Sequence, residues 1–303
     1  MDIDVNSDPR DAAEAGQSPP VTKITPDHAV KQHRALCQLG LPLQPCADAW
    51  RRDIGTVALA IEMPAGGTLP HGALLRRLLL HVFATALESG GTAVEIGESV
   101  AVLAERMGLP TDAASLQALT EQYERLISAK VSVSLDGGAA LSVFDARGRP
   151  RAVAAEWRGA VRLNARFFAG LAEGAVTLDR RVVAALTEMP LALDAYMWLA
   201  FGLANTPAEG LAGASWDDLY GRFGDQGQTP ETFRTAFEAC LCEVTAACPA
   251  IVVIMGEQGV QVRAASPARA ALPPVARPVA AAAVAVARPV PAPAPAPVAA
   301  PPQ

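Results

Sequence analysis

Apolar residues recur at helical spacing in two long stretches of the chain. The first runs over residues 68–89, between the glycine pairs Gly66-Gly67 and Gly90-Gly91. Its spacing predicts a helix of about four to five turns with one broad apolar face, although Arg76, Arg77 and His81 interrupt the pattern. The second stretch, residues 190–205, begins at a proline and is apolar on overlapping faces, which predicts a strongly apolar helix.

The first long helix is followed by a series of shorter elements. Residues 97–135 predict a helix, a turn at Gly108-Leu109-Pro110-Thr111, a longer helix and a strand. Asp136-Gly137-Gly138 is a hairpin signal, and residues 140–144 form the returning strand. A helix-turn-helix followed by a hairpin indicates a winged helix.

The second long helix is followed by the same series. A helix over residues 215–226, capped by Ser215, precedes a turn, a longer helix over 229–247 and a hairpin over 250–263. No sequence identity marks the repeat, which is one of element order. The predicted fold is therefore α+β, with tandem winged-helix (helix-turn-helix) domains and disordered termini.

Composition divides the chain further. The predicted divisions are a disordered acidic N-terminus (1–25), a first winged-helix domain (26–165), a second winged-helix domain (166–265) and a disordered Ala/Pro-rich tail (266–303). The remaining expected elements are a short helix over 26–39, a loop over 40–55, strands over 56–63 and 92–97, and short helices within 167–189.

Charge and hydropathy narrow the class of protein. The chain has 303 residues and a formal net charge of −6, of which the first 20 residues, with five acids and one arginine, carry −4. The near-neutral remainder is compatible with one basic face. The acidic N-terminus does not resemble a signal peptide, and no apolar run reaches the length of about 18 residues that a membrane helix needs. A cytoplasmic protein without a membrane partner is expected.

Residues that could carry catalysis are sparse. The five cysteines are an odd number in a chain without a secretion signal, which favours reduced thiols, and their spacing fits no familiar zinc site. There is no phosphate-binding loop of the GxxxxGK[ST] type and no paired-histidine nicking motif. We therefore expect no enzymatic activity, no cofactor and no metal.

Several segments, in this order, resemble the plasmid-encoded RepA family of replication initiators. The resemblance runs from Thr68 to Ala265 and is carried by TLPHGALLRRLLLHVFATAL, EIGESVAVLAERMGL, LTEQYERLISAKVSVS, MPLALDAYMWLAFGL, SWDDLYGRFG and FRTAFEACLCEVTAACPAIVVIMGEQGVQV. It implies a tandem winged-helix protein that binds double-stranded DNA at plasmid origin repeats and helps to open the duplex. It also implies recruitment of host replication proteins, such as the helicase or its loader, and offers no catalytic residue. A homodimer through one winged helix is one hypothesis for its assembly.

The second winged helix is the preferred DNA reader. Base contacts usually come from the N-terminal end of a recognition helix, which here begins at Thr229. Glu121 and Glu124 make the corresponding helix of the first copy a poorer reader, because they would repel phosphate. The candidate base readers are Gln226, Gln228, Thr229, Thr232, Arg234 and Thr235, with Arg222 and Arg263 flanking them on phosphates.

Weaker candidates lie in the first copy and beyond it. Arg125 and Lys130 belong to the first winged helix, and the window 147–166 is the most basic in the chain. The window's candidates for phosphate or minor-groove contacts are Arg147, Arg149, Arg151 and Arg158. A solvated loop is an equal alternative for this window, and each candidate could equally be a plain polar surface residue.

Two other functions are compatible with the same pattern. A winged-helix transcriptional regulator differs from an initiator in its biological role rather than in its fold. A protein-interaction scaffold, from a different class, is favoured somewhat by the negative net charge. Steep loss of duplex binding with rising salt would separate the DNA-binding hypotheses from the scaffold.

Overall fold

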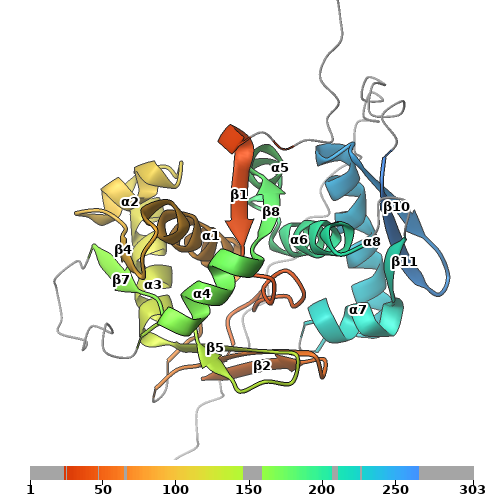
Figure 1. Ribbon diagram of the computed structural model, residues 1–303, viewed down its shortest axis with the longest axis horizontal. Coiled ribbons are helices and arrows are strands. Elements are labelled where there is room, and N and C mark those ends of the chain that lie inside the picture. Colours follow the sequence, from red (N-terminus) through yellow and green to blue (C-terminus); the bar gives the residue numbers. More distant parts are fainter. Residues whose placement is uncertain are drawn as a thin grey trace, which may run out of the picture. The chain divides into compact units, whose positions relative to one another are not determined.

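A computed structural model describes residue 24 and residues 26–46, 48–64, 67–145, 159–206, 211–225 and 227–265. All of these residues belong to one compact unit. They form helices and antiparallel strand pairs, so the predicted α+β class is confirmed (Figure 1). The predicted disordered tail and, apart from residue 24, the predicted disordered N-terminus lie outside the described residues.

The described N-terminal part of the chain builds the first of two cores. In chain order its elements are a 3-10 turn (Pro26–His28), β1 (Ala29–Gln32), β2 (Ala49–Asp53), β3 (Val57–Glu62), α1 (Gly72–Ser89), β4 (Ala93–Glu95), α2 (Val100–Arg106), α3 (Ala113–Ser128), β5 (Lys130–Leu135), β6 (Leu141–Ser142), β7 (Ala160–Arg162) and α4 (Ala165–Gly174). The apolar spacing of α1 places Leu75, Leu79 and Phe83 in this core. The helix ends at Gly90, whose left-handed backbone (φ 67°) favours glycine.

The rest of the described chain builds the second core. Its elements are β8 (Val176–Asp179), α5 (Arg180–Leu186), α6 (Pro190–Ala204), β9 (Ala212–Ser215), α7 (Trp216–Phe223), α8 (Pro230–Ala247), β10 (Ile251–Met255) and β11 (Gly259–Ala264). The strongly apolar α6 is buried on nearly all sides over its first half. Phe233, Phe237 and Leu241 of α8 pack against it, and Val260 and Val262 of β11 close the same cluster.

The second core contains the predicted series of elements in full. The order is α6, β9, α7, α8 and the β10–β11 hairpin, and the sheet order is β10–β11–β9. The strand β9 was not predicted; it gives the hairpin a third strand. This order of helices and strands is compatible with the predicted winged helix, which stays a prediction.

The first core has the same element order but different strand pairing. Its hairpin, β5–β6, is extended by β3 and β2 into a sheet of order β2–β3–β5–β6. Its short strand β4 pairs with β7 instead of joining that sheet. The two copies therefore share their order of elements and differ in how the hairpin is completed.

Several connecting segments differ from their predictions. Residues 26–39 do not form one helix, because β1 pairs with β8 along their whole lengths. The predicted loop 40–55 contains β2, and the segment 167–189 contains β8 between its two helices. β1 and β8 are four residues long and pair with each other across the chain, so local spacing carries little signal for them, whereas β2 forms a hairpin with the neighbouring β3.

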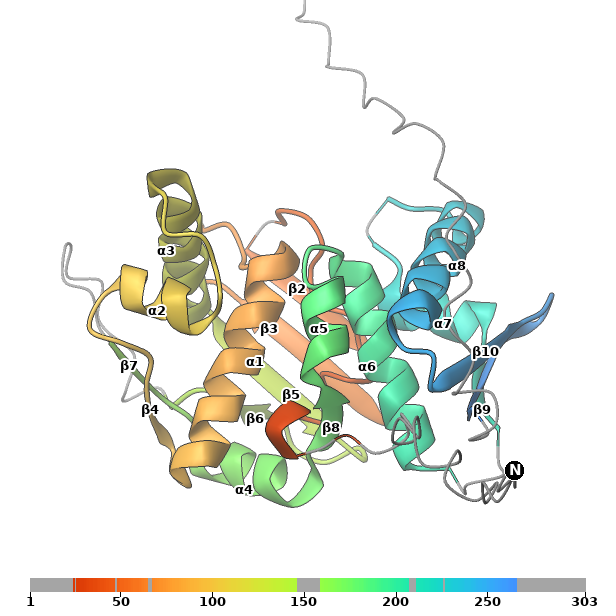
Figure 2. The same cartoon turned by 90° about the horizontal axis from the view of Figure 1, so that it is seen from above.

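The two cores meet at a fully buried ion pair. Arg76 of α1 donates from Nε to Oδ1 of Asp194 in α6 at 2.8 Å, and from Nη2 to Oδ2 at 2.5 Å. Its other donors reach the backbone carbonyls of Leu41, Pro42 and Gly72. The arginine that interrupts the apolar stripe of α1 thus joins α1, α6 and the loop 41–42, and Figure 2 shows both helices from above.

The predicted division into two domains at residue 165 stays a prediction. Phe167 and Leu171 of α4, which lie beyond that boundary, pack in the first core. Val30 and Cys37, which precede it, pack in the second. Each core therefore contains residues from the other side of position 165. The last element of the chain that packs in the first core is α4.

Candidate nucleic-acid interface

Capping contacts that are recognisable in the sequence fix the starts of α7 and α8. Ser215 caps α7 by accepting a hydrogen bond from the Asp218 amide at 3.1 Å. Thr229 caps α8, where its hydroxyl accepts from the Thr232 amide and the Thr232 hydroxyl accepts from the Thr229 amide. Pro230 in the first turn supplies a backbone angle already suited to a helix. The start of α8 is therefore well fixed.

Three of the predicted base readers lie exposed at this start. Thr229, Thr232 and Thr235 are all accessible to solvent. The Thr235 hydroxyl donates to the Glu231 carbonyl at 3.1 Å, which leaves its oxygen lone pairs directed away from the helix. Threonine at such positions can contact base edges through the hydroxyl and thymine through the methyl group.

The exposed face of α8 continues beyond these threonines as a row of small, uncharged side chains. Thr232 and Thr235 are followed at alternating intervals of four and three residues by Ala239, Cys242 and Ala246, all exposed. A helix with such a face can approach another surface closely. The last three residues were not predicted as part of the site, although their spacing opposite Phe233 and Phe237 is visible in the sequence.

Arg234 is engaged within the protein. Its Nε donates to Glu238 Oε1 at 2.8 Å, and its guanidinium lies 4.8 Å from the centre of the Trp216 ring. The side chain is half-buried. A contact between Arg234 and DNA would therefore exchange the Glu238 ion pair for a phosphate or a base.

Arg222 and Gln228 face the protein rather than a ligand. Arg222 donates from Nη1 to the Gln38 carbonyl at 3.3 Å, and burial lowers the pKa of its guanidinium. Gln228 Oε1 accepts from the Asp225 amide, and its carbonyl accepts from the Tyr220 hydroxyl. Both residues thus help to hold the α7–α8 turn in place, and their contacts with DNA stay predictions.

The exposed face of α3, in the first core, carries acidic residues. On α3, the exposed residues include Glu121 and Glu124, and Arg125 is paired with Glu121 at 3.3 Å. Lys130 at the start of β5 is paired with Glu62 at 3.0 Å. Both cations are thus neutralised by neighbours, which agrees with the expectation that this helix is the poorer reader.

Five predicted contacts cannot be placed. Gln226, Arg147, Arg149, Arg151 and Arg158 lie outside the described residues. The basic window continues into the described part with Arg162 on β7 and Arg166 on α4, both exposed. Arg263 on β11 is also exposed.

The electrostatics of α8 favour base contacts over phosphate contacts. The helix carries three acidic residues, Glu231, Glu238 and Glu243, and one basic residue, Arg234. Glu231 lies in the first turn, and hydrogen bonds from its own amide and from the Thr229 hydroxyl lower the pKa of its carboxyl. Its charge offsets the positive end of the helix dipole, so a phosphate gains little at this helix terminus.

The titratable groups that could bind a metal or act as nucleophiles are buried or scattered in the described part of the chain. The described residues contain no group of three His, Cys, Asp or Glu side chains arranged to hold a metal ion. His33 is stacked on Phe167 with ring centres 4.4 Å apart, and burial with nearby Arg34 lowers its pKa to about 4. Burial raises the pKa of Cys240 and of Cys248 to about 11, which leaves these thiols protonated and poorly nucleophilic.

Comparison with known protein families agrees with the resemblance seen in the sequence. Residues 84–217 match the family described as plasmid encoded RepA protein. This match confirms the resemblance seen in the sequence and supports a role in the initiation of plasmid replication. No curated protein sequence matches the chain.

One solved structure with a similar fold is entitled "Crystal structure of SeMet derivatives of domain2 and domain 3 of RctB". It is 8% identical in sequence, with a TM-score of 0.48, and the match covers 76% of this chain and 98% of that one. A likeness at that TM-score is too low to support a conclusion. Within the described residues, the structure contains no helix with the length and apolar character needed to cross a membrane.

Proposed function

We propose that this protein initiates plasmid replication by binding double-stranded DNA at repeats in the plasmid origin, with the N-terminal end of α8 in the major groove. The observation that carries this proposal is the exposed face of α8. It begins with Thr229, Thr232 and Thr235 at the helix start and continues with small uncharged side chains, so that the helix can approach base edges closely.

Phosphate contacts in this proposal come from elements around α8 rather than from α8 itself. Arg263 on β11 is the described candidate in the second copy, and Arg162 and Arg166 extend the basic window of the first. Each phosphate contact made by such a cation adds to the salt dependence of binding. Affinity is therefore expected to fall steeply with salt, although the chain has a net charge of −6.

The remaining parts of the proposal rest on the family match. The protein acts without catalysis or cofactor, in the cytoplasm, and recruits host replication proteins such as the helicase or its loader. A homodimer on repeated sites belongs to the same proposal. A transcriptional regulator is the alternative within the DNA-binding class. Deletion of the gene from an origin plasmid separates the two, because loss of replication requires an initiator, whereas altered transcription alone requires a regulator.

Two charge variants on one helix test the recognition helix directly. Thr235→Glu places a carboxylate at the proposed base-reading end of α8. Ala246→Glu adds the same charge on the same exposed face, about 16 Å away along the helix axis. Binding of the full chain to labelled DNA that flanks its own gene is measured by fluorescence anisotropy and footprinting.

Loss of a base contact costs about 1–3 kcal/mol, so Thr235→Glu is expected to weaken binding about tenfold or more. Ala246→Glu is expected to bind like the wild-type protein, and both variants should keep the wild-type melting temperature because both sites are exposed. Equal losses of DNA affinity in both variants would show that the N-terminal end of α8 does not contact the bases. Absence of any protected repeat would count against the initiator.

A further inference from the structure

The β10–β11–β9 sheet carries a surface that DNA binding does not explain. Among the described residues, the exposed large apolar side chains are Leu211 (52% exposed), Ile254 (43%) and Met255 (44%), and all three lie on or beside this sheet. Leu211 directly precedes β9, and the other two end β10. Leu211 and Ile254 line one hollow of this sheet, which marks an interaction site rather than scattered surface residues.

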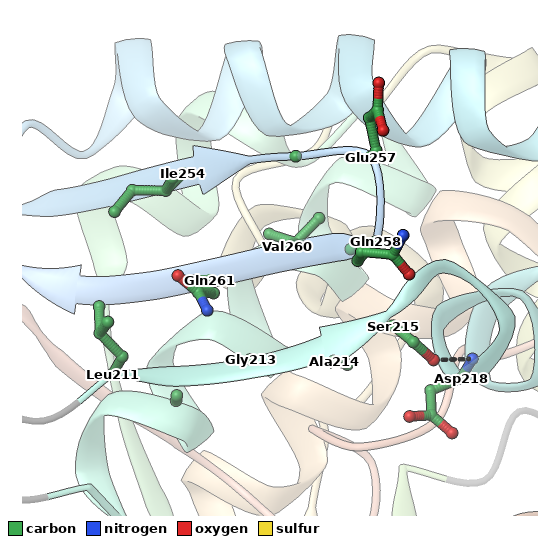
Figure 3. Close-up of a pocket in the computed structure, with 13 residues that line it drawn as sticks. Leu211, Gly213, Ala214, Ser215, Asp218, Ile254, Glu257, Gln258, Val260 and Gln261 are labelled. Atoms are coloured by element: carbon green, nitrogen blue, oxygen red, sulfur yellow. Dashed lines mark hydrogen bonds between the residues drawn. The ribbon is translucent and has the colours of Figure 1, made fainter.

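The outer face of this sheet contains a hollow of about 670 Å³. Gly213, Gln261 and Ile254 stand opposite one another across the three strands, so they share this face. A Cβ atom on Gly213 would lie 2.7 Å from the Val260 carbonyl oxygen, so close strand packing requires glycine there. Gly213 thus lets β9 lie close to β11 beside Gln261, and Figure 3 shows Leu211 and Ile254 near Gln261.

The edge of the sheet is unprotected. In the described part of the chain, β9 pairs with β11 on one side only. Its four residues, Ala212–Ser215, are small and uncharged and include no proline, and all of them line the hollow. Edge strands are normally protected by charge, proline or a bulge, so this one is open to pairing with another strand.

Charge at one end of the hollow disfavours phosphate there and selects among polypeptides. Asp218 and Glu257 line the end of the hollow near Ser215, and Asp217 lies exposed beside them. These carboxylates repel phosphate and attract lysine or arginine. A partner therefore needs basic residues at one end and large apolar residues that fill the space between Leu211 and Ile254.

The area of the face argues against a second copy of this chain. Three strands about 4.8 Å apart and about five residues long present a flat area of roughly 200 Å². A stable dimer buries about 800 Å² on each partner. A single extended segment is an occupant of the right size, because its backbone gains hydrogen bonds along β9 while alternate side chains enter the hollow.

We propose that β9 is a docking site for an extended segment of a partner protein, which adds a fourth strand to the sheet with alternating apolar residues over Gly213 and lysine or arginine at the Asp218–Glu257 end. This site goes beyond the proposed DNA binding and does not depend on it. The test contains no DNA, so failure of one proposal leaves the other standing.

Fluorescein-labelled peptides of sequence KKVTVTV and of the reversed sequence VTVTVKK serve as probes, with DDVTVTV as the acidic control. Each is titrated with the full-length protein and followed by anisotropy. We expect saturable binding of at least one basic peptide and none of the acidic peptide. Hydrogen exchange should show new protection of the Ala212–Ser215 amides, which non-specific sticking to apolar side chains would not give.

Three variants locate the site. Ile254→Glu and Asp218→Lys each change an exposed side chain of the hollow and are expected to weaken basic-peptide binding about tenfold, a difference of about 1.4 kcal/mol. Ala118→Glu, an exposed site on α3, should bind like the wild-type protein. Equal binding by all variants, absence of saturable binding, or unchanged exchange at Ala212–Ser215 would overturn the proposal. Self-association abolished by Ile254→Glu would overturn it too, by assigning the face to a second copy.

Discussion

Removal of one partner from the Arg76–Asp194 ion pair is predicted to destabilise the protein strongly. Both side chains are buried, with 0% and 1% of their surfaces exposed. The guanidinium has five N–H donors, and the structure gives all of them acceptors: two on Asp194 and three on backbone carbonyls. The pair is therefore fully satisfied, and either single substitution leaves a buried charge without its partner.

The magnitude follows from this geometry. In Asp194→Ala, two donors of a buried cation lose their acceptors, and each unsatisfied donor costs about 1–3 kcal/mol. Breaking a buried ion pair from one side costs about 3–5 kcal/mol. Because folded proteins are stable by about 5–15 kcal/mol, either single variant loses a large part of its free energy of unfolding. Replacement of both residues, as in Arg76→Met with Asp194→Leu, should recover most of the loss.

The Arg76→Met variant also gains a dependence on pH. Burial raises the pKa of the Asp194 carboxyl, and removal of Arg76 takes away the charge that opposes this shift. Since the carboxyl of the unfolded chain ionises first, stability falls as pH rises above the unfolded pKa, and returns as acid protonates Asp194 in the folded state. The variant should thus be less destabilised near pH 5 than near pH 7.5.

Urea unfolding followed by circular dichroism measures both effects. Lys130→Met is the matched control, because its ion pair with Glu62 is exposed and is worth about 0–1 kcal/mol. A loss below about 1 kcal/mol in both single variants would show that the pair does not hold the two cores together. A loss in Arg76→Met that is equal at both pH values would refute the assignment of a buried, ionised Asp194.

Three further perturbations follow from single sites. Burial lowers the pKa of His33 to about 4 from 6.5, so the contribution of the neutral imidazole to stability is complete above pH 6.5 and is lost as pH falls toward 4. In the wild-type protein this loss amounts to about 2 kcal/mol between pH 7 and pH 5. His33→Gln should remove that part of the pH dependence, as measured by urea unfolding. Phe237 packs against the rings of Trp198, Phe223 and Phe233, and Phe237→Ala should cost about 3–5 kcal/mol in the same assay, whereas a loss below about 1 kcal/mol would contradict its central place. Thr229→Ala removes the cap of α8 and should cost about 1 kcal/mol, with faster hydrogen exchange confined to the first turn of that helix.

Elements whose signals are local could be predicted from the sequence. The stripe of α1 with its terminal glycine, the apolar α6, and the caps at Ser215 and Thr229 all appear at the expected places. Each depends on residues within one or two helical turns of one another. The order of elements in both copies follows from these local signals.

Elements that depend on distant partners could not be predicted. β1 is four residues long and pairs with β8, nearly 150 residues later in the chain. Arg76 reads in the sequence as an interruption of an apolar stripe, because its acceptors lie at residues 41, 42 and 194. The contact of Arg222 with the Gln38 carbonyl was not predictable for the same reason. Spacing along the chain reports which face of an element is buried, but not what it is buried against.

The placement of α8 in the second core bears on how the proposed DNA site and peptide site would act together. Phe233, Phe237 and Leu241 of α8 share one cluster with Val260 and Val262 of β11, so α8 covers the inner face of the β10–β11–β9 sheet. The hollow at Gly213 lies on the outer face. A duplex on the exposed side of α8 and a strand on β9 would therefore contact different elements of one small core. Arg263 shares the outer face with Gln261, so a duplex that also contacts Arg263 would approach the hollow from its far end, while the acidic residues Asp218 and Glu257 disfavour phosphate at the end near Ser215.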